Sequence, residues 1–284
     1  MDPAINLPPL KVPSILRAFG LRPQKSLGQN FLIDTTALEN IIRAAEISSE
    51  HDVLEIGPGA GSLTRYLASA ARRVVAVELD HALIPVLRSV LSDRENVSIV
   101  QGDILDMNPE ELMEGKPYQV VANIPYYITS ALIRHLLESG SPPERLVLTI
   151  QKEVAERICA AEKYSLLALS IQVYGRPTTV LQIPAGAFYP PPKVDSKVIR
   201  IDLYDRPLVP AEHLDTFFKL AKAGFSQKRK TLLNAISGGL GLSKDDVRAL
   251  LARAEVDPQR RAETLQMQEW GNLAAAFLSN SQRG

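Results

Sequence analysis

Between residues 52 and 201, short runs rich in β-branched residues alternate with longer stretches of amphipathic pattern. Five of these runs read DVLEI, RVVAVEL, VSIVQG, YQVVANI and RLVLTIQ. Runs that are apolar on both faces and alternate with helical segments are typical of a parallel sheet covered by helices. Two later runs, PTTVLQI and SKVIRIDL, have no helical pattern between them, so we expect an antiparallel pair at the sheet edge. The pattern predicts a doubly wound α/β domain.

The pattern changes near residue 208. From there, stretches with helical periodicity follow one another, among them AEHLDTFFKLAKAGF and SKDDVRALLARAEV, with Gly, Ser and Pro between them. We therefore predict two domains. Residues 1–207 would hold an N-terminal arm and the sheet, and residues 208–284 would form a small all-helical domain.

The bulk properties exclude several classes of protein. The chain has 284 residues, 45% of them hydrophobic and 23% charged, which is typical of a folded globular protein. It has no apolar stretch of the roughly 18 residues that a membrane-spanning helix needs, and its start lacks the pattern of a secretory signal. A single cysteine, Cys159, and four scattered histidines offer no metal-ligand spacing. We expect a cytoplasmic chain with no membrane contact and no metal.

The formal net charge of zero hides a gradient along the chain. Residues 1–30 carry a net charge of +3, residues 31–110 carry −7, and residues 205–284 carry +3. Basic ends around an acidic middle are consistent with a surface that binds a polyanion. They are equally consistent with chance variation in the charge of solvent-exposed faces. Charge alone leaves both interpretations open.

The stretch VLEIGPGAGSLTRYLA predicts a strand, a tight turn and a helix. The turn contains Gly57, Gly59 and Gly61, which let a ligand approach the backbone at the helix start, and Glu55 precedes the first glycine by two positions. Glu78 ends the next strand, where a carboxylate can accept hydrogen bonds from both hydroxyls of a ribose. This pattern predicts a nucleoside site but does not separate a nicotinamide cofactor from S-adenosylmethionine.

Two more polar side chains follow the next strand ends. Asp103 follows VSIVQG and could accept from the amine of an adenine, and Asn123 ends YQVVAN. Because the carboxyl ends of parallel strands meet at one edge, we expect Glu78, Asp103 and Asn123 side by side in the ligand crevice. Each residue alone could be an ordinary turn former.

The segment NIPYY beginning at Asn123 suits methylation of the exocyclic amine of adenine. This nitrogen is a poor nucleophile because its lone pair is delocalised into the ring. The Asn123 side-chain oxygen and the Ile124 carbonyl could accept its two N–H groups and favour a tetrahedral nitrogen. Pro125 would fix the turn, and Tyr126 would offer a face on which an unstacked base can lie. We expect the neighbouring Tyr127 to pack.

Basic residues next to an aromatic or a stiff proline run are candidates for RNA contacts. In FYPPPKVDSKV, Phe188 precedes three prolines, and Lys193 and Lys197 are placed to contact phosphates. Phe188 could equally be a core residue. In FSQKRKTL, the basic run comes at a helix start, and a solvated surface is the alternative. Its members are Lys228, Arg229 and Lys230.

The motifs KSLGQNFL, EIGPGAG, VELD, GDILD, NIPYYI, FYPPPKVDSKV and FSQKRKTL occur in this order. Together they resemble the KsgA-type ribosomal small-subunit RNA adenine N6,N6-dimethyltransferases over nearly the whole chain. The resemblance implies a Rossmann-like, S-adenosylmethionine-dependent methyltransferase domain followed by a helical RNA-binding domain. It also implies that the small ribosomal subunit is the partner, and that two adjacent adenosines in a hairpin loop near the 3′ end of its RNA are each methylated twice.

The resemblance also assigns site residues. The arm would close over the methionine end of the cofactor, and Phe188 would form a base sandwich with Tyr126. The cofactor positions are Asn30, Leu32, Gly57, Gly59, Glu78, Leu79, Asp103, Ile104 and Asn123. The first ten residues match nothing in the family, and we expect them to be disordered. We also expect a monomer.

Three alternatives remain open. Large-subunit resistance methyltransferases share the glycine turn and a similar N-I-P-Y segment. A DNA adenine methyltransferase would use a related motif on the same nitrogen. A ribosome assembly factor could keep the fold and act by binding alone, although binding would not need the amine acceptors of Asn123 and Ile124.

Overall fold

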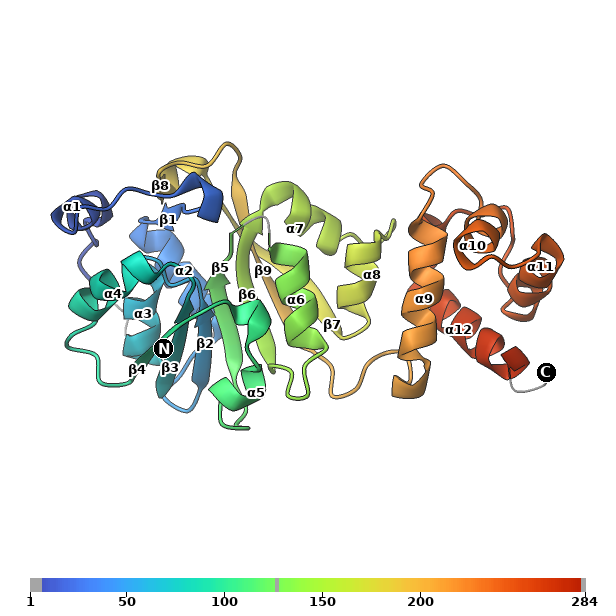
Figure 1. The fold of residues 1–284 in the computed structure, drawn as a ribbon, viewed down its shortest axis with the longest axis horizontal. Coiled ribbons are helices and arrows are strands. Elements are labelled where there is room, and N and C mark those ends of the chain that lie inside the picture. Colours follow the sequence, from blue (N-terminus) through green and yellow to red (C-terminus); the bar gives the residue numbers. More distant parts are fainter. Residues whose placement is uncertain (1–6, 126–127, 282–284) are drawn as a thin grey trace. The chain divides into compact units, whose positions relative to one another are not determined.

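A computed structural model describes residues 7–125 and 128–281, and the chain divides into two compact units (Figure 1). The first unit comprises Met1–Ala155 and Pro177–Leu203, and the second comprises Glu156–Arg176 and Tyr204–Gly284. The first unit contains the sheet. The second is helical.

The sheet has seven strands in the order β4-β3-β2-β5-β6-β9-β7. Five of them form a parallel core: β2 Asp52–Ile56, β3 Arg73–Glu78, β4 Val97–Gln101, β5 Gln119–Asn123 and β6 Arg145–Gln151. Next to this core, β9 (Ser196–Leu203) runs antiparallel to β6, and β7 (Gly175–Ile183) lies beside β9 at the edge. The predicted doubly wound α/β class is confirmed.

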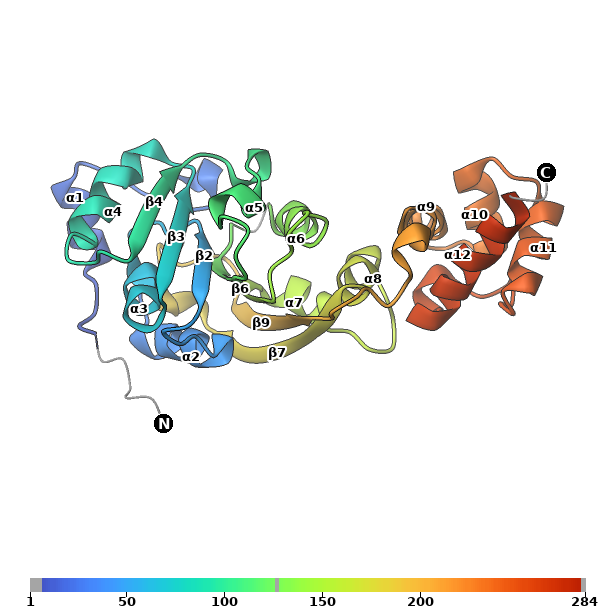
Figure 2. The same ribbon diagram turned by 90° about the horizontal axis from the view of Figure 1, so that it is seen from below.

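Helices cover both faces of the sheet (Figure 2). On one face, α2 (Thr35–Ala45) and α3 (Ser62–Ala70) bury their apolar sides, including Ile41 and Leu67, against sheet residues such as Val53 and Val121. The remaining α-helices of this unit are α1 Val12–Ala18 in the arm, α4 Ile84–Val90, α5 Pro109–Leu112, α6 Thr129–Leu137 and the start of α7 Lys152–Ile158. Because the sheet is covered on both sides, its inner strands are almost wholly apolar.

The N-terminal arm packs against the sheet domain, which corrects one expectation. Residues 1–10 were expected to be disordered, but Pro8 accepts a hydrogen bond from Arg65 at 3.0 Å and Leu10 packs with α1 (Val12–Ala18). Residues 1–6 lie outside the described residues. Farther along the arm, β1 (Phe31–Leu32) pairs antiparallel with β8 (Phe188–Tyr189). The arm is therefore part of the folded domain from residue 7 onward.

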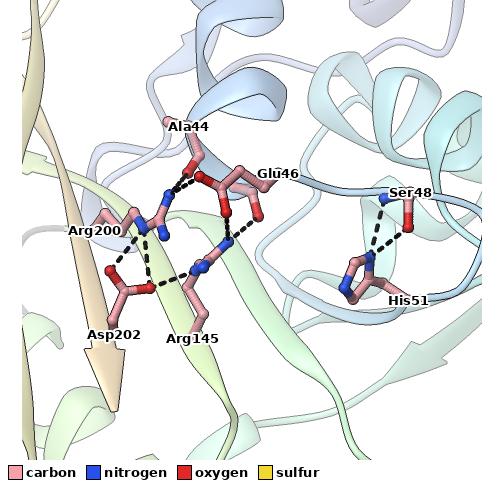
Figure 3. A network of polar contacts seen from close by, with 8 residues as sticks. Ala44, Glu46, Ser48, His51, Arg145, Arg200 and Asp202 are labelled. Carbon is pink, nitrogen blue, oxygen red and sulfur yellow. Dashed lines mark hydrogen bonds and ion pairs between the residues drawn. The ribbon is translucent and has the colours of Figure 1, made fainter. Parts of the chain in front are cut away.

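A network of charged side chains attaches the end of α2 to the sheet (Figure 3). Arg145 donates to Glu46 at 2.9 Å and to Asp202 at 2.6 Å, while Arg200 donates to Glu46 at 2.6 Å and to Asp202 at 2.8 Å. Both arginines also donate to carbonyls of the last two residues of α2. Hydrogen bonding from Arg200 lowers the pKa of Glu46. The carbonyls that a helix end leaves unpaired are satisfied here by two cations.

The second unit forms its own core from the packed faces of its helices. Trp270 and Phe217 are fully buried there, and a Cβ added at Gly224 would come within 2.6 Å of the Trp270 ring. Its helices are α8 Leu166–Gln172, α9 Leu214–Phe225, α10 Leu232–Leu240, α11 Lys244–Arg253 and α12 Met267–Ser281. Only a glycine lets α9 and α12 approach this closely.

This unit differs from the predicted division after residue 207. It begins at Tyr204 and also takes in residues 156–176, because Leu169 and Val173 are buried in the same core as Phe217. In the sequence, α8 lies between two strands, so the pattern alone assigned it to the sheet domain. Its apolar face is instead buried among helices.

Within the described ranges, 7–125 and 128–281, the structure offers neither a membrane-spanning helix nor a cluster of metal-ligating side chains. There, each helix is too short or too polar to cross a bilayer. In the same ranges, no group of three or more His, Cys, Asp or Glu side chains is placed to hold a metal ion.

Arg145→Ala should lower the free energy of unfolding by about 1–3 kcal/mol, because the change removes a largely buried cation and leaves carboxylate and carbonyl acceptors underpaired. Urea denaturation measures the difference. Arg43→Ala, on α2, is the matched control: the Arg43 side chain is 71% exposed and its ion pair with Glu39 spans 4.0 Å. Equal losses in the two variants would contradict a stabilising role for the network.

Candidate active site

A cavity lies at the carboxyl ends of β2, β3 and β5 and beside the loop that follows β4. The arm segment 27–32 forms another wall. All nine predicted cofactor positions line this cavity: Asn30, Leu32, Gly57, Gly59, Glu78, Leu79, Asp103, Ile104 and Asn123. Two of the predicted catalytic residues, Ile124 and Pro125, line it as well. The structure thus brings these residues into one site, as the strand order requires.

The glycine turn after β2 is the floor of the site. Gly57, Gly59 and Gly61 have φ angles of 67°, 61° and 85°, in the left-handed region that other residues avoid. A Cβ at Gly59 would come within 2.8 Å of the Phe31 ring. The glycines therefore provide both the turn and the close contact with the arm.

Glu78 at the end of β3 is bound by the backbone on both carboxylate oxygens. Its Oε2 accepts from the Gly59 N–H at 2.9 Å, and its Oε1 accepts from the Asp80 N–H at 2.8 Å. Burial raises the pKa of Glu78, and the backbone hydrogen bonds oppose that shift. A carboxylate oxygen can accept more than one donor, so Glu78 can still accept ribose hydroxyls.

Asp103 both caps a turn and lines the cavity. Its Oδ1 accepts from the Leu105 N–H at 2.9 Å, at the start of the short helix Ile104–Asp106. Asp103 is therefore a turn former and also a residue of the cavity wall. In the strand order, β4 and β3 bring Asp103 and Glu78 to one side of the glycine turn, while β5 brings Asn123 to the other.

Asn123 is oriented by the arm. Its Nδ2 donates to the Asn30 carbonyl at 3.0 Å, so its Oδ1 stays available as an acceptor. Ile124 is buried, and its N–H donates to the Thr149 carbonyl at 3.2 Å. A Cβ at Gly57 would lie 3.9 Å from both Asn123 and Pro125, which places the glycine turn directly beside this segment. Tyr126 and Tyr127 lie outside the described residues.

The other predicted contacts lie away from the cavity lining. Phe188 is 3% exposed and belongs to the core that covers α2 and α3, which is the alternative left open for it. Lys193 is exposed, and Lys197 lies half-buried on β9. The basic run of the second unit is exposed between α9 and α10, and its members are Lys228, Arg229 and Lys230.

Several lining residues were not assigned to the site from sequence, Glu55 and Gln29 among them. Burial raises the pKa of Glu55 to about 8, so its side chain is mainly protonated at neutral pH. The signal for Glu55 was its place two residues before the first glycine. Gln29 had no signal of its own, because its contact is with residue 80.

The cavity fits S-adenosylmethionine in the chemistry of its donors and acceptors. Glu78 and Asp103 line the cavity with carboxylates to which a ribose and an adenine amine could donate, and the glycine turn leaves backbone N–H groups open to a ligand. Glu55 Oε2 and Ser62 Oγ are buried in this lining without a hydrogen-bond partner among the described residues. A polar ligand would give these atoms the partners that buried polar groups require.

Comparisons with known proteins show which family the chain matches. Residues 20–277 match the family described as Ribosomal RNA adenine dimethylase. The chain is 44% identical to "Ribosomal RNA small subunit methyltransferase A" of Dehalococcoides mccartyi over 94% of this chain and 92% of that protein. It is also 44% identical to the protein of the same name from Alkaliphilus metalliredigens, over 96% and 97% of the two chains.

Two solved structures share the architecture. A dimethyladenosine transferase from Plasmodium falciparum superposes with a TM-score of 0.75 at 27% identity, covering 88% of this chain and 98% of that one. The 23S rRNA methyltransferase ErmE superposes with a TM-score of 0.70 at 29% identity, covering 87% and 99%. The family match spans most of the chain, from residue 20 to residue 277. The chain belongs to the ribosomal RNA adenine dimethylase family.

Proposed function

We propose that this chain dimethylates N6 of two adjacent adenosines in a hairpin loop near the 3′ end of small-subunit ribosomal RNA, as a step in small-subunit biogenesis. The methyl donor is S-adenosylmethionine, as in the methyltransferases of this family. One observation carries the proposal: Asn123 lies beside the glycine turn with its amide nitrogen already bound to Asn30, so that its oxygen is available to an amine. The proposed substrate places the chain in the cytoplasm, and we expect it to act as a monomer.

When bound, S-adenosylmethionine supplies an electrophilic methyl group on a sulfonium. The chain has to hold the target nitrogen with its lone pair toward that methyl group. Asn123 Oδ1 and the Ile124 carbonyl would accept the two N–H groups of the amine, which pulls the lone pair out of conjugation with the ring. Positive charge that develops on the amine nitrogen would strengthen both of these hydrogen bonds.

The small subunit is the proposed source of the RNA because the curated relatives at 44% identity are named as small-subunit methyltransferases. ErmE supports a second candidate, since a large-subunit enzyme shares the fold over nearly its whole length. ErmE is 29% identical to this chain and the small-subunit relatives are 44% identical, which favours the small subunit.

Methyl transfer from labelled S-adenosylmethionine tests the two candidates directly. The acceptors are small ribosomal subunits lacking adenine methylation, large subunits and duplex DNA. Nucleoside analysis then identifies the methylated base in each. Dimethyladenosine in small-subunit RNA alone is the expected result. Label in large-subunit RNA or DNA would overturn the proposed substrate, and tight subunit binding without transfer would favour an assembly factor.

Asn123→Ala should lower the rate of methyl transfer at saturating substrates by about 10²- to 10³-fold, because the oxygen that accepts the amine is lost. S-adenosylmethionine should still bind. Single-turnover kinetics and calorimetric titration separate the two effects. Loss of cofactor binding in proportion to loss of rate would show that Asn123 acts through the pocket and not on the amine.

Glu55→Gln should make stability less dependent on pH. The folded chain holds a proton on Glu55 up to its pKa of about 8, whereas the unfolded chain releases it near the ordinary value of 4.5. Stability therefore falls by about 1.4 kcal/mol per pH unit as pH rises through this interval, and glutamine lacks this term. Urea denaturation at pH 5.5, 6.5 and 7.5 should show that the free energy of unfolding falls less steeply with pH in the variant than in the parent. Glu95→Gln, at an exposed position, is the control. If the free energy of unfolding of Glu55→Gln fell with pH as steeply as that of the parent, the raised pKa would be contradicted.

We also propose that the helical unit binds RNA through its basic run. Replacing Lys228, Arg229 and Lys230 by Gln should weaken binding and lower the slope of log affinity against log salt by about 2, since each phosphate contact contributes roughly 0.7–0.9. Lys193 and Lys197 are candidates for the same test. The control replaces exposed basic residues of α11, namely Lys244, Arg248 and Arg253. A slope that falls equally in both variants would assign the run to general surface charge.

A further inference from the structure

Two glutamines of the N-terminal arm converge on one oxygen of Asp80. Gln24 Nε2 donates to Asp80 Oδ2 at 2.9 Å, and Gln29 Nε2 donates to the same oxygen at 2.7 Å. Asp80 is only 6% exposed, and its other oxygen accepts from the Ala82 N–H at 3.0 Å. A buried carboxylate therefore joins the arm to the end of β3.

We call residues 24–30 the arm loop, and this loop is closed on itself. The Gln24 N–H donates to Gln29 Oε1 at 2.8 Å, and the Gln29 N–H donates to the Gln24 carbonyl at 3.3 Å. Gly28 supplies the left-handed turn between them, with φ of 63°. The two glutamines are thus tied together, and Asp80 holds them as one unit.

The arm loop forms a wall of the cavity through residues 27–30, while residues 24–26 face solvent. Among the described residues, its hydrogen bonds to the rest of the domain are those with Asp80 and with Asn123. Beyond the loop, the chain is held by the β1–β8 pair. Asp80 is therefore one of the two residues to which the arm loop is attached by hydrogen bonds, and it lies two positions after Glu78.

We propose that Asp80 is a positioning residue that latches the arm loop over bound S-adenosylmethionine and sets how fast the cofactor leaves. A carboxylate suits this task because one oxygen can accept two amide donors, and hydrogen bonds to a charged acceptor are stronger than neutral ones. The Asp80 N–H also binds Glu78, so the latch begins two residues from the carboxylate proposed to hold the ribose. The inference rests on the proposed function, since it takes S-adenosylmethionine as the ligand.

The latch is tested by the release of S-adenosylmethionine and of its demethylated product, measured by stopped flow on the full chain. Gln24→Ala with Gln29→Ala should speed release by roughly tenfold or more, because two bonds to a charged acceptor are lost. These arm residues are at least partly exposed, so the pair of changes tests the latch even if Asp80→Asn disturbs the turn. Ser26→Ala, at an exposed position of the same loop, should leave the release rate unchanged.

A polarity swap separates the latch from a general structural role. Gln29→Glu places a carboxylate against Asp80, and Asp80→Asn places an amide there, so each change alone should speed release. In the double variant the introduced amide can donate to the introduced carboxylate, and Gln24 can turn its amide oxygen to accept from the same amide. Slow release should therefore return, a coupling that lost folding stability would not produce.

The outcomes distinguish the latch from the proposed function. Release rates that stay at the parent value in the Gln24→Ala, Gln29→Ala variant would overturn the latch while leaving the proposed function intact. Faster release in the single swaps without recovery in the double variant would also overturn it. Absence of S-adenosylmethionine binding in the unaltered chain would overturn the proposed function, and the latch with it.

Discussion

Glu78 accepts the Gly59 N–H with one carboxylate oxygen and the Asp80 N–H with the other, and the geometry of the cavity depends on these two bonds. The first fixes the glycine turn of β2 against the end of β3. The second fixes the residue to which the arm is attached. Because both partners are backbone groups, the position of the Glu78 carboxylate depends on no other side chain.

Burial of acidic side chains at this point costs stability, and the cavity shows how that cost is limited. Burial raises the pKa of Glu55 to about 8 and raises that of Glu78 as well. Glu78 offsets part of its desolvation with backbone hydrogen bonds, whereas Glu55 is largely protonated at neutral pH. Perturbed acids that line a cavity are typical of ligand sites, where local stability is given up for recognition.

The arm links the two chemical tasks of the site. Its glutamines bind Asp80, and its Asn30 carbonyl accepts from Asn123. The first contact lies beside the proposed ribose site, and the second orients the amide proposed to hold the adenine amine. One segment thus forms a wall of the cavity and orients Asn123 on β5, so the order of this segment affects both.

The sequence by itself determined the sheet class, the glycine turn and the polar residues at the strand ends. These features are local: β-branched runs predict strands, glycine spacing predicts a turn, and parallel strands bring Glu78, Asp103 and Asn123 to one edge wherever their side chains point. The resemblance to a known family named the full set of nine cofactor positions, two of them in the arm, before the cavity was known. Their roles as ligands remain predictions, although the structure brings all nine to one cavity.

Only the tertiary structure decided which distant segments meet. The contacts of Gln24, Gln29 and Asn30 with Asp80 and Asn123 join residues 51 to 93 positions apart, and no local pattern encodes such a pairing. The same holds for Phe188, which is buried because β8 pairs with β1. It also holds for α8, which ends at Gln172 and whose apolar face is buried among helices that begin only at Leu214. Periodicity shows that a face must be buried, but the partner that buries it is selected by packing of the whole chain.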